Sequence, residues 1–145
     1  MIWTPRTTVA AVIERDNRFL FVEELINNKM TLNQPAGHLE DNESLIEAVI
    51  RETQEETAWQ FSPQSLVGIY QWRADNNDTY IRYCFTGDLI SHNPAQALDP
   101  DIQQTIWLDL DTFLARKSHL RSPLVMDCIE DYLAGERHSL SLLHN

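Results

Sequence analysis

The alternation of apolar and polar residues predicts two strands near the start of the chain. Residues 8–13 form a β-branched and apolar run, and residues 18–23 form another after the polar segment 14–17. Two such runs joined by a short polar segment are typical of a β-hairpin. We therefore expect the two segments to pair with each other.

Residues 33–38 interrupt this pattern with a proline and a glycine, which favours a shaped loop over a regular element. A helical pattern follows, and its apolar surface is supplied by Leu45, Ile46, Ala48, Val49 and Ile50. We expect this helix to end near Thr57 or Ala58.

The start of the helix can be capped in two ways. Asp41 or Asn42 can accept the first free backbone N–H groups, or Ser44 can do so in a capping box with Glu47. The pattern alone leaves both open.

The second half of the chain predicts further strands at 66–72, 80–89 and 105–108, with a polar turn at 73–78 and a loop at 92–101. A short helix should follow from Asp109 or Asp111 to Arg116. Another should start at Pro123, and Gly135 should stop it. Strands, a helix, more strands and terminal helices indicate a mixed sheet with helices on its faces, of the α/β (α+β) class.

Composition limits the classes of protein to which the chain can belong. Its 145 residues, 43% apolar and 23% charged, predict one globular domain over residues 1–145. The net charge of −11, from 22 acidic against 11 basic residues, repels phosphate backbones and anionic membranes. We therefore expect neither nucleic acid nor membrane as a partner. Such acidity is compatible with binding of divalent cations.

The cysteines and the apolar runs indicate a cytoplasmic protein. Cys84 and Cys128 show no CxxC spacing and no secreted-type density, and we expect both to be buried thiols. Neither a leader pattern nor 18 consecutive apolar residues occurs in the sequence. We expect a reducing cytoplasm.

Three glutamates on the predicted helix point to metal chemistry. Glu52, Glu55 and Glu56 stand at positions i, i+3 and i+4, which share one helix face. Carboxylates this close repel one another, and Arg51 alone cannot neutralise three of them. Oxygen ligands of this kind suit Mg²⁺, with Mn²⁺ as a substitute, and Mg²⁺ commonly shares its sites with substrate phosphates. A solvated acidic face is the competing interpretation of these three residues.

The full string at fixed spacing favours the metal site. Gly37, Glu43, Arg51-Glu52 and Glu55-Glu56 match the box of the Nudix hydrolase family, which this sequence resembles. Thr53 and Ala58 depart from the family pattern, the latter standing where a glycine is usual. If Ala58 is left-handed, it should cost about 1 kcal/mol.

The resemblance extends beyond the box and is nearest to the NudJ group of bacterial phosphatases. The segments that carry it are residues 8–10, 21–24, 33–40, 71–72 and 120–125. It implies an α/β/α sandwich with a mixed sheet. It also implies metal-dependent cleavage of a pyrophosphate linkage in thiamine-pathway pyrophosphates (thiamine pyrophosphate, hydroxymethylpyrimidine pyrophosphate) and nucleoside di- and triphosphates.

The same resemblance implies roles for the box residues. It makes Glu52, Glu55, Glu56 and the carbonyl of Ala36 metal ligands. Arg51 would hold the carboxylates in place, for which its forked guanidinium is suited. Glu43 would tie the loop to the helix, or simply favour the first helical turn.

Catalysis of this kind needs a carboxylate that accepts the proton of the attacking water, which the metal activates for in-line attack on phosphorus. Glu52 is the first candidate for this base. Asp99 and Asp101 are the alternatives from a later loop, and Asp101 is preferred for its placement six residues before Trp107.

Substrate-binding candidates are weaker because their residue types are common in strands and on surfaces. Trp72 and Arg82 lie on the two strands joined by the 73–78 turn, where an aromatic ring could stack on a heterocycle. Arg6 and Arg121 could contact terminal phosphates. His38, beside the box glycine, is left unassigned.

Two other functions remain open. One is an ADP-ribose or dinucleotide pyrophosphatase, which would release two monophosphate-bearing halves. The other is a non-catalytic Nudix module that senses a nucleotide. In each case the partner is a small phosphorylated molecule, and the protein could be a monomer or a homodimer.

Overall fold

The computed structural model describes residues 1–145. Its strands are β1 (Arg6–Val12), β2 (Glu14–Arg15), β3 (Arg18–Ile26), β4 (Lys29–Asn33), β5 (Ala36–His38), β6 (Trp59–Arg73), β7 (Thr79–His92) and β8 (Ile102–Asp109). Its α-helices are α1 (Leu45–Thr57), α2 (Leu110–Ala115) and α3 (Pro123–Leu133), and short 3-10 turns are η1 (Lys117–His119) and η2 (Leu140–Leu142).

The strands form two sheets. The first has the order β5-β1-β7-β6, in which β1 runs parallel to β7 and the other pairs are antiparallel. The second is antiparallel and is centred on β3, which pairs with β2, β4 and β8. The first sheet is therefore mixed, as the sequence predicts.

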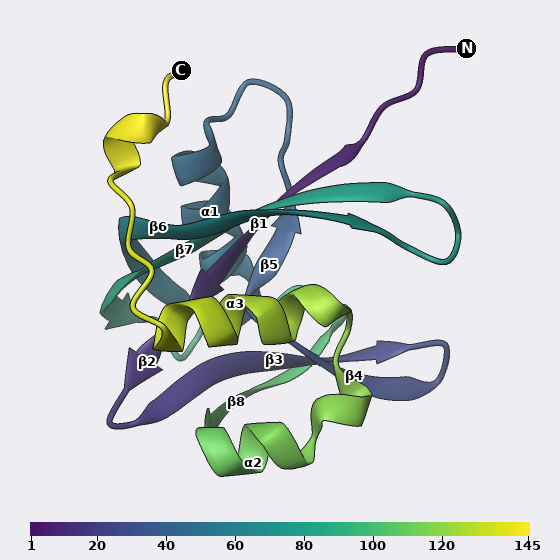
Figure 1. The fold of residues 1–145 in the computed structure, drawn as a ribbon. Coiled ribbons are helices and arrows are strands. Elements are labelled where there is room, and N and C mark those ends of the chain that lie inside the picture. The colour runs from purple at the N-terminus through teal and green to yellow at the C-terminus, as the bar shows by residue number, and fades with distance from the viewer.

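Helices cover the sheets from both sides (Figure 1). Alternation along β1 sends Val9 and Ala11 into one buried cluster with Ala48 and Val49 of α1. It sends Val12 into the other cluster, which contains Val125 of α3 and Phe113 of α2. The α/β/α layering and the α+β class are confirmed.

The predicted hairpin between residues 8–13 and 18–23 is wrong. β1 pairs with β5 and β7, whereas β3 belongs to the other sheet. The chain turns at Asp16 and Asn17, which both have positive φ (54° and 62°), and only β2 and the carbonyl of Ile13, which accepts from the N–H of Leu20 at 2.9 Å, pair back onto β3. Two successive residues with positive φ make a tight turn of the kind found in hairpins. The chain has already passed from the first sheet to the second before this turn, at Ile13, between the end of β1 and the start of β2.

The segment 33–38 is not the single loop that the sequence predicts. Asn33 ends β4 and Ala36 begins β5, with only Gln34 and Pro35 between them. β5 pairs with β1 through three residues. Such short strands lack the length on which an alternation pattern depends.

Helix α1 begins and ends as the sequence allows. Ser44 is its N-cap and forms a capping box with Glu47, so Asp41 and Asn42 are not the cap. The helix ends at Thr57, and Ala58 follows in the left-handed region (φ 61°). The strain expected of a non-glycine residue there is present, at a cost of about 1 kcal/mol.

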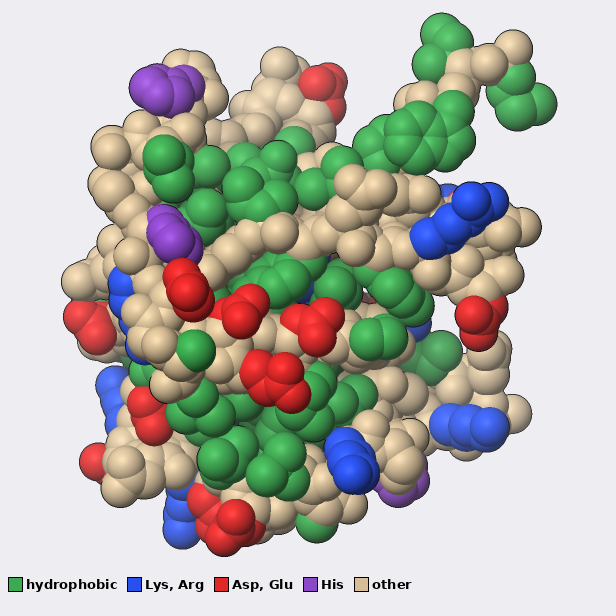
Figure 2. Space-filling view, viewed as in Figure 1, with side chains coloured by type: hydrophobic (Ala, Val, Ile, Leu, Met, Phe, Trp, Pro, Cys, Tyr) green, Lys and Arg blue, Asp and Glu red, His purple; other side chains and the backbone are tan.

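The second half of the chain follows its prediction. β6, β7 and β8 contain the expected strands, although β6 begins earlier, at Trp59. Asp109 caps α2, Pro123 opens α3, and Gly135 with φ 87° follows it. Acidic side chains gather over α3 on the face shown in Figure 2. No helix is long and apolar enough to cross a membrane.

The capping box gives a prediction about stability. Ser44→Ala should lower the free energy of unfolding by about 1 kcal/mol, because the N–H of Glu47 then loses its acceptor. Asp41→Ala is the control and should change it by less than about 0.5 kcal/mol. Urea denaturation of both variants measures the difference. Equal effects of the two substitutions would show that Ser44 is not the cap that matters.

Candidate active site

The C-terminal half of α1 lies against β5. A Cβ atom built on Gly37 would meet the carboxylate carbon of Glu52 at 2.1 Å and its two oxygens at 2.3 Å. A side chain on residue 37 would force the carboxylate of Glu52 to move. Glycine at this position therefore allows Glu52 to keep its place against β5.

A second contact ties the next turn of α1 to the same strand. The backbone N–H of Ala36 donates to Oε1 of Glu56 at 2.9 Å. In an antiparallel strand the N–H and C=O of one residue face the same edge. The carbonyl of Ala36 therefore faces the helix side, together with Glu56, as expected of a backbone ligand.

Arg51 organises the carboxylates around the helix. It donates to both oxygens of Glu43 (2.7 and 3.0 Å), to Glu52 at 2.8 Å and to Glu55 at 3.2 Å, and also to the carbonyl of His38. Its hydrogen bond to Glu43 raises the pKa of Arg51, and the same bond lowers the pKa of Glu43. The arrangement agrees with an orienting role for Arg51 and a tying role for Glu43, whose Oε1 also accepts from the N–H of Glu40.

The three glutamates of the helix lie close to one another but at different depths. No group of three acidic, histidine or cysteine side chains is placed to hold a metal ion. The side chain of Glu55 is 46% exposed, whereas Glu52 and Glu56 are buried. Because Nη1 of Arg51 donates to both Glu52 and Glu55, the carboxylate of Glu55 lies at the rim beside that of Glu52.

Glu52 and Glu56 line a pocket of about 400 Å³ between the sheets. Glu24 of β3 and Asp99 of the loop before β8 face the same pocket. Burial raises the pKa of Glu52 against the hydrogen bond from Arg51, and it raises the pKa of Glu24. Burial raises the pKa of Glu56 well above its usual range, and the charges of Glu24 and Glu52 add to this. This wall of the pocket therefore favours a cation or protons.

The residues present fit a divalent metal. Two inward carboxylates, whose pKa values burial has raised, and a nearby backbone carbonyl are hard oxygen donors. Mg²⁺ is commonly bound through one or two carboxylates plus substrate phosphates, so the site does not need Glu55 inside the pocket.

The loop carboxylate in the pocket is Asp99, not Asp101. Asp101 is exposed and does not line the pocket, and its backbone N–H donates to Oδ1 of Asp99 at 3.0 Å. The N–H of Asp99 in turn donates to the carbonyl of Glu55, which fixes the loop against α1. Asp101 therefore lies outside the lining of the pocket, although its charge acts on Glu24.

Basic and aromatic residues also line the pocket. Arg82, Arg121 and Trp72 all line it, as expected for substrate-binding residues. Tyr80 lines it too, with its ring centroid 5.7 Å from that of Trp72 at an interplanar angle of 30°. The two rings offer an aromatic surface beside the charged walls.

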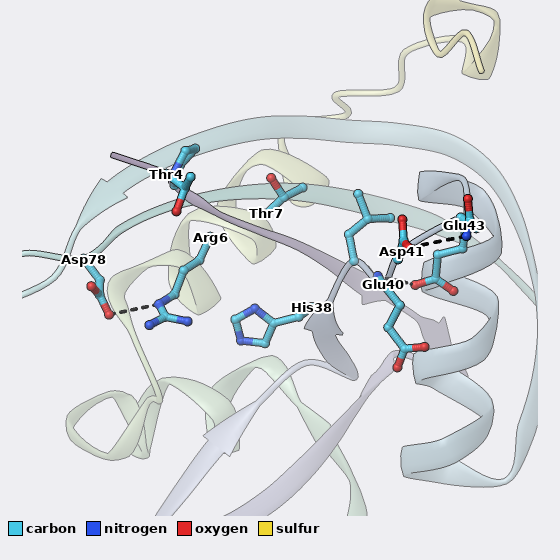
Figure 3. Close-up of a pocket in the computed structure, with 11 residues that line it drawn as sticks. Thr4, Arg6, Thr7, His38, Glu40, Asp41, Glu43 and Asp78 are labelled. Carbon is cyan, nitrogen blue, oxygen red and sulfur yellow. Dashed lines mark hydrogen bonds and ion pairs between the residues drawn. The ribbon is translucent and has the colours of Figure 1, made fainter. Parts of the chain in front are cut away.

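Arg6 lies elsewhere. It lines an adjoining polar groove of about 730 Å³ together with His38 and Glu40, and its Nε binds Asp78 at 3.0 Å (Figure 3). Because the groove shares His38 and Glu40 with the pocket, the two are continuous. Arg6 is therefore outside the pocket that contains Glu52 and Glu56.

Sequence reasoning missed several residues of the site. Glu24, Asn33 and Tyr80 line the pocket without having been assigned a role. Glu24 is the second of two glutamates at the end of an apolar strand, which is a signal of an inward polar residue. Only the fold shows which of the two faces the pocket, because Glu23 is also buried, against Arg116.

Comparisons with known proteins agree with this geometry. The NUDIX domain model matches residues 4–128. Phosphatase NudJ of Escherichia coli K12 is 40% identical over 142 residues, which cover 98% of this chain and 92% of that protein. A NUDIX hydrolase from Nitrosomonas europaea has a TM-score of 0.96 at 46% identity, covering 98% of this chain and 97% of the other.

A more distant structure shows the same fold with a ligand. The NUDIX domain of Shewanella oneidensis NrtR, solved in complex with ADP ribose, has a TM-score of 0.74 at 20% identity and covers 92% of this chain and 90% of the other. With the matched domain and the identity to NudJ, the chain belongs to the Nudix hydrolases, enzymes that act on acid anhydrides in phosphorus-containing compounds.

Proposed function

We propose that this enzyme is a Mg²⁺-dependent hydrolase, with Mn²⁺ as a substitute, that cleaves terminal pyrophosphate linkages. The observation that carries the proposal is one pocket that is lined by carboxylates, Glu52 and Glu56, and by arginines, Arg82 and Arg121. A diphosphate bound with its metal needs both kinds of residue, carboxylates for the cation and arginines for the phosphate oxygens. Its proposed substrates are thiamine-pathway pyrophosphates and nucleoside di- and triphosphates, which the resemblance to NudJ phosphatases implies.

Each kind of residue has a defined task. Glu52, Glu56 and the carbonyl of Ala36 would hold the metal, which when bound polarises phosphate oxygens and activates the attacking water. Arg51 orients Glu52 through a hydrogen bond from Nη1. The same nitrogen also donates to Glu55, which lies at the edge of the pocket and helps to hold Arg51 in place. Arg82 and Arg121 would bind phosphate, and Trp72 would stack on the heterocycle.

Glu52 is the proposed base, because it lines the pocket and burial raises its pKa, which makes the carboxylate a better proton acceptor. Asp99 replaces Asp101 as the alternative, since only Asp99 faces the pocket.

The two free, buried cysteines support a reducing cytoplasm as the proposed location. The proposed assembly stays a monomer or a homodimer, and the whole of residues 1–145 is proposed to act as one domain.

Two alternatives are kept. Hydrolysis of ADP-ribose or dinucleotides is favoured by the ADP ribose bound to the related fold of NrtR. A non-catalytic sensor would keep the fold without turnover. The inward placement of Glu52 and Glu56 argues against the sensor, because a sensor has no need of carboxylates whose burial is costly.

Glu56→Gln tests the metal assignment. The amide keeps an oxygen that can accept from the N–H of Ala36 but removes the charge. We expect turnover with Mg²⁺ to fall by more than about a hundred-fold, since even outer-shell partners of a metal can cost that much. Glu130→Gln, on the exposed face of α3, is the matched control and should keep full activity. Activity of Glu56→Gln within a few-fold of wild type would refute the assignment.

A second prediction concerns stability against pH. Because burial raises the pKa values of Glu52 and Glu56, the folded state holds these protons more tightly than the unfolded state. The free energy of unfolding without metal therefore falls as pH rises above the ordinary value of 4.5, until the folded pKa values are passed. Mg²⁺ should counteract this loss by pairing with the ionised carboxylates.

Melting temperatures with EDTA and with Mg²⁺ at two pH values measure this effect. We expect Mg²⁺ to raise the melting temperature clearly at about pH 8 and much less at about pH 5, where protons compete for the same carboxylates. The Glu56→Gln variant should gain less from Mg²⁺ at the higher pH. A gain that is equal at both pH values would mean that the cation binds elsewhere.

A product-resolved assay tests the substrate class. Thiamine pyrophosphate, its pyrimidine pyrophosphate precursor, nucleoside triphosphates and ADP-ribose are each incubated with enzyme and Mg²⁺, and the products are separated by ³¹P NMR. We expect orthophosphate from the terminal linkages. Two monophosphates from ADP-ribose at a higher kcat/KM would favour the first alternative, and no turnover on the whole panel would favour the sensor.

A further inference from the structure

Arg82 is a buried cation with an unusual set of partners. It lies on β7, is only 5% exposed, and takes part in none of the seven salt bridges of the chain. Its Nε has no hydrogen-bond partner. Burying a charge without an opposite charge is costly, so such a group is retained where something else pairs with it.

Two neutral amides hold the guanidinium in place. Nη1 donates to Oε1 of Gln34 at 2.8 Å, and Nη2 donates to Oδ1 of Asn33 at 3.2 Å. Each amide is fixed at its other end: Gln34 donates to the carbonyl of Val125 at 2.9 Å, and Asn33 donates to Glu24 at 3.4 Å. The amide oxygens therefore face Arg82, which is oriented without being neutralised.

The same chain treats its other partly buried arginines differently. Arg51 is bound by carboxylates, among them Glu43 at 2.7 Å, and Arg116 is bound by Glu23 at 3.0 Å. Both charges are thereby neutralised within the protein. Arg82, which lines the pocket, has no direct carboxylate partner: Glu24 acts on it across Asn33 rather than in an ion pair.

Other positive features lie at the same end of the pocket. Arg121 lines it, as do Ser122 and Leu124 from the first turn of α3. Pro123 has no N–H and the N–H of Leu124 donates to the Ser122 hydroxyl, so this turn contributes the positive partial charge of the helix rather than free donors. Behind Arg82 the structure is closed, because Gln34, Val125 and Cys128 are fully buried.

We propose that Arg82, oriented by Asn33 and Gln34, forms a subsite for a terminal phosphate, with the two amides acting as positioning residues that leave its charge unpaired. The inference deepens the proposed function and rests on it for the identity of the substrate. A phosphate at the closed end can be substituted only on the side that faces the pocket mouth. The subsite therefore takes phosphate monoesters or the last phosphate of a chain, and it rejects phosphates that are esterified on both sides.

The test measures binding of inorganic phosphate by isothermal titration in EDTA, so it needs neither metal nor turnover. Arg82→Gln should weaken binding by about ten- to a hundred-fold, because a charge-assisted pair is lost. Arg73→Gln, on the exposed end of the neighbouring strand, is the matched control and should bind as wild type does. Unchanged binding by Arg82→Gln would overturn the subsite.

Gln34→Glu tests the role of the amides. A carboxylate oxygen can still hold the guanidinium, but the hydrogen bond to the carbonyl of Val125 is lost, so the thermal melt of the variant is compared with that of wild type to separate a loss of structure from a loss of charge. We expect that phosphate binding weakens by about ten-fold, because Arg82 is then neutralised. Asn33→Asp serves the same purpose if Gln34→Glu does not fold, as judged by its thermal melt. Binding at wild-type strength in the folded variant would overturn the positioning role.

Methyl phosphate and dimethyl phosphate complete the test. The monoester should displace inorganic phosphate from wild type, and the diester should do so about ten-fold less well or not at all. Equal displacement by both would overturn the claim that the subsite is closed. If phosphate binds through Arg82 but no substrate is hydrolysed, the subsite stands and the proposed function fails. If substrates are hydrolysed but Arg82→Gln binds phosphate as wild type does, the proposed function stands and the subsite is overturned.

Discussion

The close approach of α1 to β5 is the constraint on which the site depends. Glu52 lies where a side chain on residue 37 would have to be, and Glu56 accepts the backbone N–H of Ala36. Both carboxylates are therefore held inside the fold, and burial raises the pKa of each. A helix placed only slightly further out would leave them solvated, with ordinary acidity and little need for a cation.

The arginines show how one chain uses the same side chain for opposite purposes. Arg51 is surrounded by carboxylates and holds the loop, the helix and Glu52 in register. Arg82 is bound by the side-chain amides of Gln34 and Asn33, which leave it without a direct ion pair where it lines the pocket. The pocket thus contains both carboxylates and arginines inside a protein whose net charge is −11, which fits a ligand that carries both phosphate and metal.

Sequence reasoning succeeded where the signal is local. The start, the end and the inward face of α1 follow from a capping box, from an apolar period and from fixed spacing, and the structure shows all three. It failed where strands choose their partners over a distance, since nothing in residues 8–23 indicates that β1 and β3 enter different sheets.

The placement of individual side chains also exceeded what spacing can predict. Helical periodicity puts Glu55 beside Glu56, but the pull of Arg51 on Glu55 decides where its carboxylate lies. Likewise, only the hydrogen-bonded turn shows that Asp99, and not Asp101, faces the pocket.

The central claim is that one pocket binds both the metal and the diphosphate, and the most direct test measures the affinity for Mn²⁺ by electron paramagnetic resonance. The affinity is measured without and with methylenediphosphonate, a diphosphate analogue that the enzyme cannot hydrolyse. If the carboxylates hold the metal and the arginines hold the phosphates of one ligand, each should strengthen binding of the other by about ten-fold, and reciprocally. The gain should vanish in Glu56→Gln. An Mn²⁺ affinity that is the same with and without the diphosphonate would contradict a common pocket for metal and diphosphate.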